Sequence, residues 1–256
     1  MSMFTSGVPG IMASEEMQGT GLVTVASKTN WGSNADASSY VSSSVTTTAG
    51  ALCILVGMWT VASPSVANAT ISGATCLSNL NGVSNAAFNS VGAPLYEIEV
   101  WIAKGTGTAS TITASFGGTQ TSGFFVLFQC SNVNVAGGPI WGGTGGTNYG
   151  VQQVQTINDG LVYDMTRATG TGIGCPLNPF TSINNGTFSV VGVDYPPTWD
   201  PNIVKPGWTC PWSPAWVNPS AGAAAAWTAY NDQTPKFYAN ATSQKFAGVS
   251  MELVSI

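Results

Sequence analysis

Two glutamates, at positions 97 and 99, come closest in residue type and spacing to a catalytic pair. The surrounding stretch YEIEVWI alternates apolar and polar residues, which is the pattern of a half-buried β-strand. Glu97 and Glu99 therefore share one face of a strand, about 6.5–7 Å apart. Glycoside hydrolases use paired carboxylates near that spacing. The alternative, which we favour, is that both lie exposed on the solvent face of a sheet or at a subunit contact, because no other residues complete an active site.

Other catalytic and metal chemistries find little support. Histidine is absent, which removes the serine–histidine and cysteine–histidine mechanisms. The glycine-rich tract at residues 142–147 lacks the lysine of a phosphate-binding loop. Calcium, held by Asp159 and Asp164 or by Asp194 and Asp200, is less favoured than ordinary turn roles. The cysteines contain no CxxC pair and do not suggest zinc: Cys53, Cys76, Cys130, Cys175 and Cys210. The sequence predicts a non-enzymatic protein without metal or cofactor.

The charge content points to an assembly. Only 7% of the residues are charged, against a usual figure of roughly 25%. A net charge of −5 with six Lys and Arg excludes a basic surface of the kind that binds nucleic acid. A large surface with so few charges is better suited to being covered by neighbouring molecules than to standing alone. We therefore expect a homo-oligomer or a component of a larger assembly.

The sequence also predicts the compartment. Residues 1–21 have neither a cationic region nor a long apolar segment, so no signal peptide is expected. The most apolar run, residues 49–62, is too short to span a bilayer, and no membrane association is expected. Cys53 and Cys130 lie within apolar runs, where a thiol packs as a small hydrophobe. We expect the chain to be made and folded in a cytoplasm.

Short strands separated by turns dominate the pattern. Residues 95–133 read as a three-stranded β-meander with two glycine-rich turns. Residues 51–59 and 124–128 are apolar runs typical of strands buried on both faces. Residues 63–92 carry turn chemistry, and residues 221–230 are expected to form a short helix or an irregular alanine-rich turn. Further strands are expected at residues 22–27, 151–157, 160–165, 188–193, 237–239 and 247–256. The predicted fold class is all-β, with a jelly-roll-like antiparallel β-sandwich as first choice.

A proline- and tryptophan-rich loop is expected at residues 194–219. It holds seven prolines, a density that excludes a central strand. Its four tryptophans could cover one end of the sandwich as a small additional core, anchor a protein interface, or stack on sugar rings. These interface candidates are Trp199, Trp208, Trp212 and Trp216.

The first 21 residues are expected to form an extended polar arm. Such an end is frayed unless something holds it, so the arm either lies against a partner or neighbouring subunit or folds back on its own domain. Its apolar residues are candidate contacts: Met3, Phe4, Ile11 and Met17. The expected division is an arm with the first strand at residues 1–44 and a β-sandwich domain at residues 45–256, with residues 194–219 as a loop insertion.

The order of the strand motifs resembles that of tailed-phage virion proteins with jelly-roll domains. The chain runs TTTAGALCILVGMWT, YEIEVWIAKG, TASTITASF, FFVLFQCSNV and finally AGVSMELVSI. Trp101, Ala103, Lys104 and Gly105 match the family's second element, and residues 111–114 match its third. Residues 129–131, Gln-Cys-Ser, depart from the family's usual Glu-Tyr-Ser. The resemblance covers residues 45–133 and the last ten residues.

That resemblance implies a role in a virion and carries no catalytic residues. Proteins of this kind serve as capsid decoration proteins, head fibres, tail adaptors or tail-fibre domains. The first hypothesis is a capsid decoration or cement protein that binds the major capsid protein and neighbouring copies, located in virions assembled in the host cytoplasm. The second is a carbohydrate-binding or receptor-binding tail domain that uses exposed tryptophans. A glycoside hydrolase that uses Glu97 and Glu99 is the third.

Overall fold

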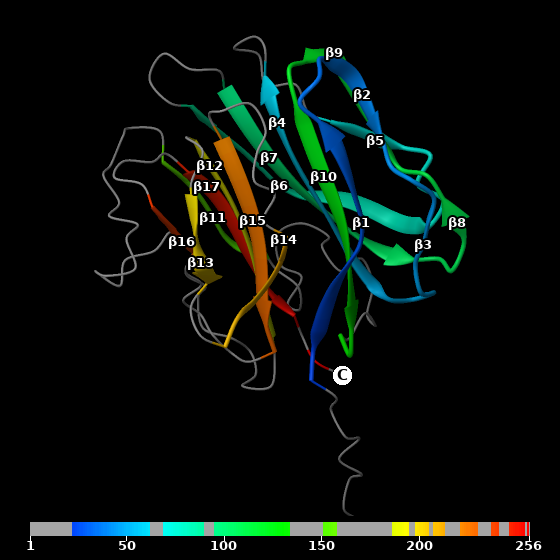
Figure 1. The fold of residues 1–256 in the computed structure, drawn as a ribbon. Coiled ribbons are helices and arrows are strands. Elements are labelled where there is room, and N and C mark those ends of the chain that lie inside the picture. Colours follow the sequence, from blue (N-terminus) through cyan, green and yellow to red (C-terminus); the bar gives the residue numbers. More distant parts are fainter. Residues whose placement is uncertain are drawn as a thin grey trace, which may run out of the picture.

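The computed structural model describes residues 22–61, 69–89, 95–133, 151–157, 186–194, 198–204, 207–212, 221–229, 237–240, 246–253 and 255. The regular elements of these residues are β-strands, and every pairing among them is antiparallel. The predicted all-β class and the antiparallel sandwich are confirmed. Figure 1 shows three layers, with a central sheet between a second sheet and a smaller outer layer.

The central sheet is five-stranded, in the order β1-β10-β4-β7-β6. Its middle strand, β4, is the apolar run LCILVGMWTV, and its neighbours β10 and β7 come from the predicted meander. The bounds are β1 (Thr24–Ser33), β4 (Leu52–Val61), β6 (Leu77–Asn89), β7 (Leu95–Gly105) and β10 (Gly123–Ser131). Residues along β4, β7 and β10 alternate between two hydrophobic clusters, one on each face, so this sheet is buried on both sides as predicted for β4 and β10.

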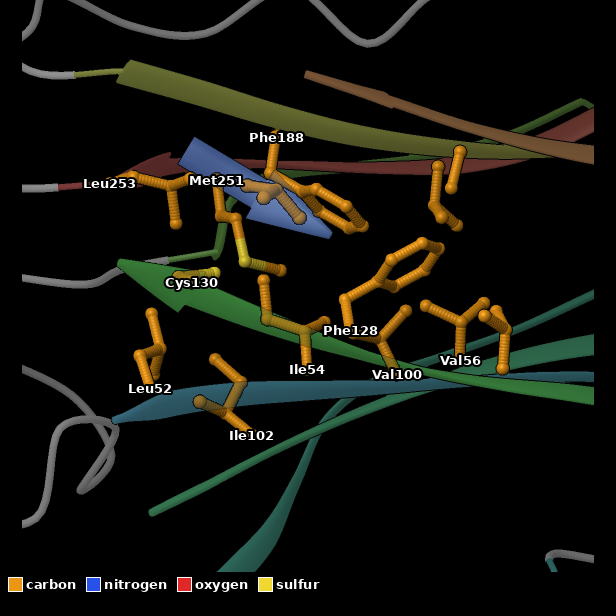
Figure 2. Close-up of a cluster of buried hydrophobic side chains, with 14 of the residues drawn as sticks. Leu52, Ile54, Val56, Val100, Ile102, Phe128, Cys130, Phe188, Met251 and Leu253 are labelled. Carbon is orange, nitrogen blue, oxygen red and sulfur yellow. The ribbon is translucent and has the colours of Figure 1, made fainter. Parts of the chain in front are cut away.

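The second sheet packs on one face of the central sheet. Its order is β11-β17-β12-β15-β14, and β6 lies against β11 while β1 lies against β14. The bounds are β11 (Val151–Ile157), β12 (Gly186–Asp194), β14 (Thr209–Trp212), β15 (Ala221–Thr228) and β17 (Phe246–Leu253). Between the two sheets lies a cluster that we call the sandwich core. In Figure 2, Phe188, Met251 and Leu253 of the second sheet point toward Phe128 and Ile54 of the central sheet.

The outer layer covers the opposite face of the central sheet. It consists of a three-stranded sheet, β2-β9-β5, and the short pair β3-β8. The bounds are β2 (Ala37–Val41), β3 (Val45–Thr46), β5 (Thr70–Ser72), β8 (Ala109–Ser110) and β9 (Thr113–Gln120). The cluster beneath this layer, which we call the outer core, includes Trp31, Tyr40, Trp59, Trp101 and Phe125. Five of the strands therefore form a layer that the sequence did not separate from the sandwich.

Two segments differ from the sequence prediction. Residues 221–228, AGAAAAWT, form strand β15 instead of a helix or irregular turn, because they pair with β12 and β14 and bury Ala223 and Ala225 in the sandwich core. Alanine favours a helix by intrinsic propensity, but its small side chain also fits a sheet that packs closely. The second segment is residues 63–92, where turns were predicted and where strands β5 and β6 lie.

The proline- and tryptophan-rich segment is also partly a correction. Residues 194–219 were predicted as a loop, but they contain strand β13 (Thr198–Val204), which pairs with β16 (Phe237–Asn240), and strand β14. β14 is an edge strand of the second sheet, and β13 has β16 as its one partner among the described strands. Pro201 and Pro211 lie in these strands, consistent with the confinement of proline to strands with an unpaired edge.

Several predictions are not settled by the described residues. The arm at residues 1–21 and the strand at residues 160–165 lie outside them. The division at residues 44 and 45 stays a prediction, although β1 pairs with β10 and β2 pairs with β9. Within the described part of the chain, no helix has the length and apolar character needed to cross a membrane.

Candidate functional site

The glutamate pair lies inside the protein, not on its surface. Glu97 and Glu99 are on β7 and share the face of Trp101, which belongs to the outer core. The exposed fraction is 0% for Glu97 and 7% for Glu99. The preferred prediction, two exposed carboxylates, is therefore wrong. Strand alternation gave the shared face correctly, but it did not show that the outer layer covers that face.

The neighbours of the pair come from the two strands beside β7. Trp59 of β4 stands directly opposite Glu97, and Gly57 stands opposite Glu99. On the other side, Asn85 of β6 stands opposite Glu99, and the register irregularity between Gly82 and Ser84 lies opposite Trp101 and Val100, the next residues of β7. A Cβ atom added at Gly82 would lie 3.4 Å from Oε1 of Glu99, so the carboxyl rests against the bare backbone of this bulge.

The environment of Glu99 favours its neutral form. Burial raises the pKa of Glu99 to about 8, the nearby Glu97 adds to the rise, and a hydrogen bond from the Ala69 backbone opposes it. Oε2 of Glu99 has no hydrogen-bond partner among the described residues. Glu99 therefore carries a proton at neutral pH, whereas an exposed glutamate is ionised.

This enclosure does not suit the hydrolase hypothesis. A retaining or inverting glycosidase needs both carboxyl groups in contact with the sugar or with a water on its face. Glu97 has no exposed surface, and Glu99 has very little. A polysaccharide cannot reach the pair while the outer layer is in place. The geometry instead describes two buried carboxyls, and burial favours the neutral form of Glu99.

The tryptophan candidates are spread over different elements. Trp208 precedes β14 and is 9% exposed, so its ring is not a platform for a sugar. Trp212 is on β14, opposite Ala225, and Trp199 is on β13, opposite Ala239. Trp216 lies outside the described residues, as do Met3, Phe4, Ile11 and Met17.

The cysteines behave as packing residues. Cys53, Cys76 and Cys130 are buried free thiols. Burial raises the pKa of Cys53 to about 12 and that of Cys130 still further above its ordinary value. Among the described residues no group of three or more metal-ligating side chains comes together. The prediction that Cys53 and Cys130 pack as small hydrophobes is confirmed.

One surface feature was missed by the sequence reading. The outer face of the β2-β9-β5 sheet carries two rows of short side chains that run across all three strands: Ser39, Ser115 and Thr70, then Val41, Thr113 and Ser72. The three strands contain no charged residue. Val41 is 56% exposed, one of the most exposed large hydrophobic residues described. We call this surface the hydroxyl face. Of its three strands the sequence predicted only β9, as part of the meander, and only the pairing aligned its rows.

Comparison of the chain with protein-family models, with curated proteins and with solved structures gave no match. The fold therefore defines the protein only as an all-β sandwich with an additional outer layer, and its function has to be argued from its own residues.

Proposed function

We propose that this chain is a non-enzymatic structural component of a tailed-phage virion, most simply a capsid decoration or cement protein. It would bind the capsid shell, through the major capsid protein, and neighbouring copies of itself. The finer assignment of the sandwich to the jelly-roll class belongs to the same proposal. Both rest on the resemblance of the strand motifs at residues 45–133 to such virion proteins.

The observation that carries the proposal is the hydroxyl face. The three strands of this face contain no charged residue, and only 7% of the residues in the whole chain are charged. Interface centres are depleted in charged residues, and short side chains lose little rotamer freedom when they are covered. A neighbouring subunit could therefore cover this face at small desolvation and entropy cost.

The body behind the face fits an adhesive role. A central sheet buried on both sides, with a hydrophobic cluster against each face, gives a rigid support for the outer layer. Rigid support lowers the ordering cost of binding, because the surface is already in its bound form.

Immunogold electron microscopy of virions that carry this chain tests the location. Labelling of the capsid exterior is expected. Labelling of the tail would overturn the decoration role and favour a tail or fibre component, and particles without label would overturn the virion assignment.

Size-exclusion chromatography with light scattering tests self-association. The full chain is expected to elute well above the 26.2 kDa monomer. Val41→Glu with Thr113→Glu places two charges on the hydroxyl face and should return it to monomer, whereas the matched control Thr108→Glu, at an exposed turn, should not. A full chain that is monomeric at its highest soluble concentration contradicts binding between copies. A chain that starts at Leu22 separates the contribution of the arm.

A glycan-binding or receptor-binding tail domain is the alternative. Enclosure of Trp208 removes one of its four proposed stacking rings, so the alternative now depends on Trp199, Trp212 and Trp216. Binding on a glycan array that is lost in Trp199→Ala or Trp212→Ala would place this alternative first.

A further inference from the structure

The exposed edge of β6 carries a dipeptide that can react with itself. Asn-Gly occurs twice in the chain, at residues 81–82 and 185–186, and the first pair lies on β6 with both residues exposed. Asparagine is among the thermolabile residues, and a following glycine has no side chain to hinder attack of its backbone nitrogen on the asparagine amide. We propose that Asn81 and Gly82 form a site of spontaneous deamidation in the folded protein. Such a site would exist in a virion protein and in a glycan-binding domain alike.

The reaction needs only water besides the chain. The backbone nitrogen of Gly82 attacks Cγ of Asn81, and the new C–N bond closes a five-membered succinimide ring. The side-chain nitrogen leaves as ammonia and takes the proton of the Gly82 amide with it. Water then adds to one of the two ring carbonyls and opens the ring. The product at position 81 is aspartate or isoaspartate, and in isoaspartate the backbone runs through the former side chain.

The attacking amide points away from the partner strand. At the end of β7, the Gly105 amide donates to the carbonyl of Ala51, the residue before β4. β4 and β7 pair without a register shift, and the hydrogen-bonding groups of a strand alternate in direction, so Trp101 also directs its amide and carbonyl toward β4. Gly82 stands opposite Trp101, and its own amide therefore points away from β7. Because β6 is an edge strand, no described strand pairs with it on that side.

The backbone around the pair departs from a regular strand. The register of β6 against β7 shifts between Ser78 and Asn81 and again between Gly82 and Ser84. Asn79, two residues before Asn81, has a positive φ of 54°. Ring closure requires the backbone at Asn81 to rotate out of the extended form. Because the ladder is interrupted on both sides and β6 has one pairing partner, this rotation breaks fewer regular hydrogen bonds than it would inside a sheet.

The product changes the edge of the central sheet. Either form adds a negative charge at an exposed position of a chain whose net charge is already −5. Isoaspartate also adds one carbon to the backbone between Asn81, which pairs with Ile102, and Gly82, which pairs with Trp101. The two pairings cannot both keep their register after that insertion. Deamidation therefore alters β6 in charge and in length.

The second Asn-Gly pair supplies an internal comparison. Gly186 begins β12, the middle strand of the second sheet, and it is buried. A Cβ atom added at Gly186 would lie 2.8 Å from the carbonyl oxygen of Thr228 and 3.2 Å from the side chain of Val23. The backbone at Gly186 is therefore packed against its neighbours, and its nitrogen can close a succinimide ring only when this part of the sheet opens.

Peptide mapping by mass spectrometry of the full chain, incubated at mildly alkaline pH, measures both pairs in one sample. In the folded protein, Asn81 is expected to deamidate at least about tenfold faster than Asn185, the effect of a local opening equilibrium that differs by one order of magnitude. In concentrated urea, where the packing around Gly186 is lost, the two rates should become similar. Equal rates in the folded chain, or no reaction at Asn81, would overturn the proposal.

Two variants test the roles of the two residues. Gly82→Ala should slow the reaction at Asn81 by at least about fivefold, because a side chain on the attacking residue hinders ring closure. The variant should fold, since Gly82 does not adopt a positive φ and the nearest atom to the added Cβ, Oε1 of Glu99, is 3.4 Å away. Asn81→Gln keeps an amide but moves it one methylene further from the backbone, and position 81 should stay unreacted. A wild-type rate in Gly82→Ala would show that Gly82 is not the attacking group.

The product formed by the unmodified protein distinguishes ring closure from direct hydrolysis of the side chain. Opening of a succinimide gives aspartate and isoaspartate together, and an isoaspartate-specific methyltransferase labels only the second. Label is expected in the peptide that contains position 81. Aspartate without isoaspartate at that position would show direct hydrolysis and refute attack by Gly82.

Discussion

The two faces of the central sheet are made by the same three strands but bury different kinds of side chain. On the sandwich side, β4 and β7 contribute an aliphatic set that includes Ile54, Val56, Ile98 and Val100. On the outer side, alternate residues of the same strands contribute Trp59, Trp101 and the two glutamates. One face thus packs like an ordinary sandwich, and the other combines aromatic rings with a buried acidic pair.

The difference follows from what covers each face. The sandwich core is closed by a second five-stranded sheet, whose Phe188 meets Phe128 edge to face at a centroid distance of 5.2 Å. The outer core is covered by short strands, and large aromatic side chains fill the space between these strands and the central sheet. Phe125 lies at its centre, with ring centroids of Trp31 at 5.4 Å and Trp59 at 6.1 Å. Large rings allow a thin cover to exclude water.

The strongest test of the comparison removes one phenylalanine from each face. Phe125→Ala and Phe128→Ala should each lower the free energy of unfolding by about 3–5 kcal/mol, because both side chains are fully buried. Urea denaturation followed by tryptophan fluorescence measures both. If Phe125→Ala costs less than about 1 kcal/mol, the outer core is not part of the cooperative unit and the two faces are energetically unequal.

A smaller effect is expected from adding one methyl group to the outer core. A Cβ atom at Gly57 would lie 2.5 Å from Cε1 of Phe125, so Gly57→Ala must displace a packed ring and should destabilise by about 1–3 kcal/mol. Gly117→Ala is the matched control, because nothing lies within 4 Å of the added atom. Equal midpoints for the two variants in thermal or urea unfolding would show that the outer core is loosely packed.

Hydrogen bonds at the corner of the outer layer give the next effect. Oγ1 of Thr47 donates to the Cys76 carbonyl at 2.6 Å and accepts from the Thr106 amide at 3.2 Å, and the residue is buried. Thr47→Val should cost about 1 kcal/mol, because it removes two hydrogen bonds at a buried position, while the Thr106 amide keeps its 3.0 Å bond to the Cys76 carbonyl. The exposed neighbour Thr46→Val should stay within about 0.5 kcal/mol of wild type in the same urea titration. A similar loss in both would point to the strand backbone rather than to the hydroxyl.

The smallest effect is expected on the hydroxyl face. Val41→Thr should change the free energy of unfolding by less than about 0.5 kcal/mol, because the side chain is 56% exposed in the single chain. Calorimetry at two protein concentrations checks this. A larger loss that grows with protein concentration would show that Val41 is covered in a self-associated form.

The fold class and most of the strands could be predicted from the sequence. The alternation of Tyr96, Ile98 and Val100 with Glu97 and Glu99 placed these residues on the correct faces, and the apolar runs of β4 and β10 indicated burial on both sides. Local pattern failed where the partner strands decided the outcome. The alanine-rich β15 is a strand because β12 and β14 flank it, and β6 is a strand because β7 pairs with it.

The candidate site shows the same division. The sequence by itself determined that Glu97 and Glu99 point to one side of β7, because successive side chains of a strand point to opposite faces whatever surrounds them. Only the tertiary structure decided that this side is closed, since β2, β5 and β9 pair with each other through contacts between distant segments of the chain. Burial depends on those distant contacts, and the protonation of Glu99 depends on burial. The local pattern therefore fixed the position of the pair, and the packing of distant strands fixed its chemistry.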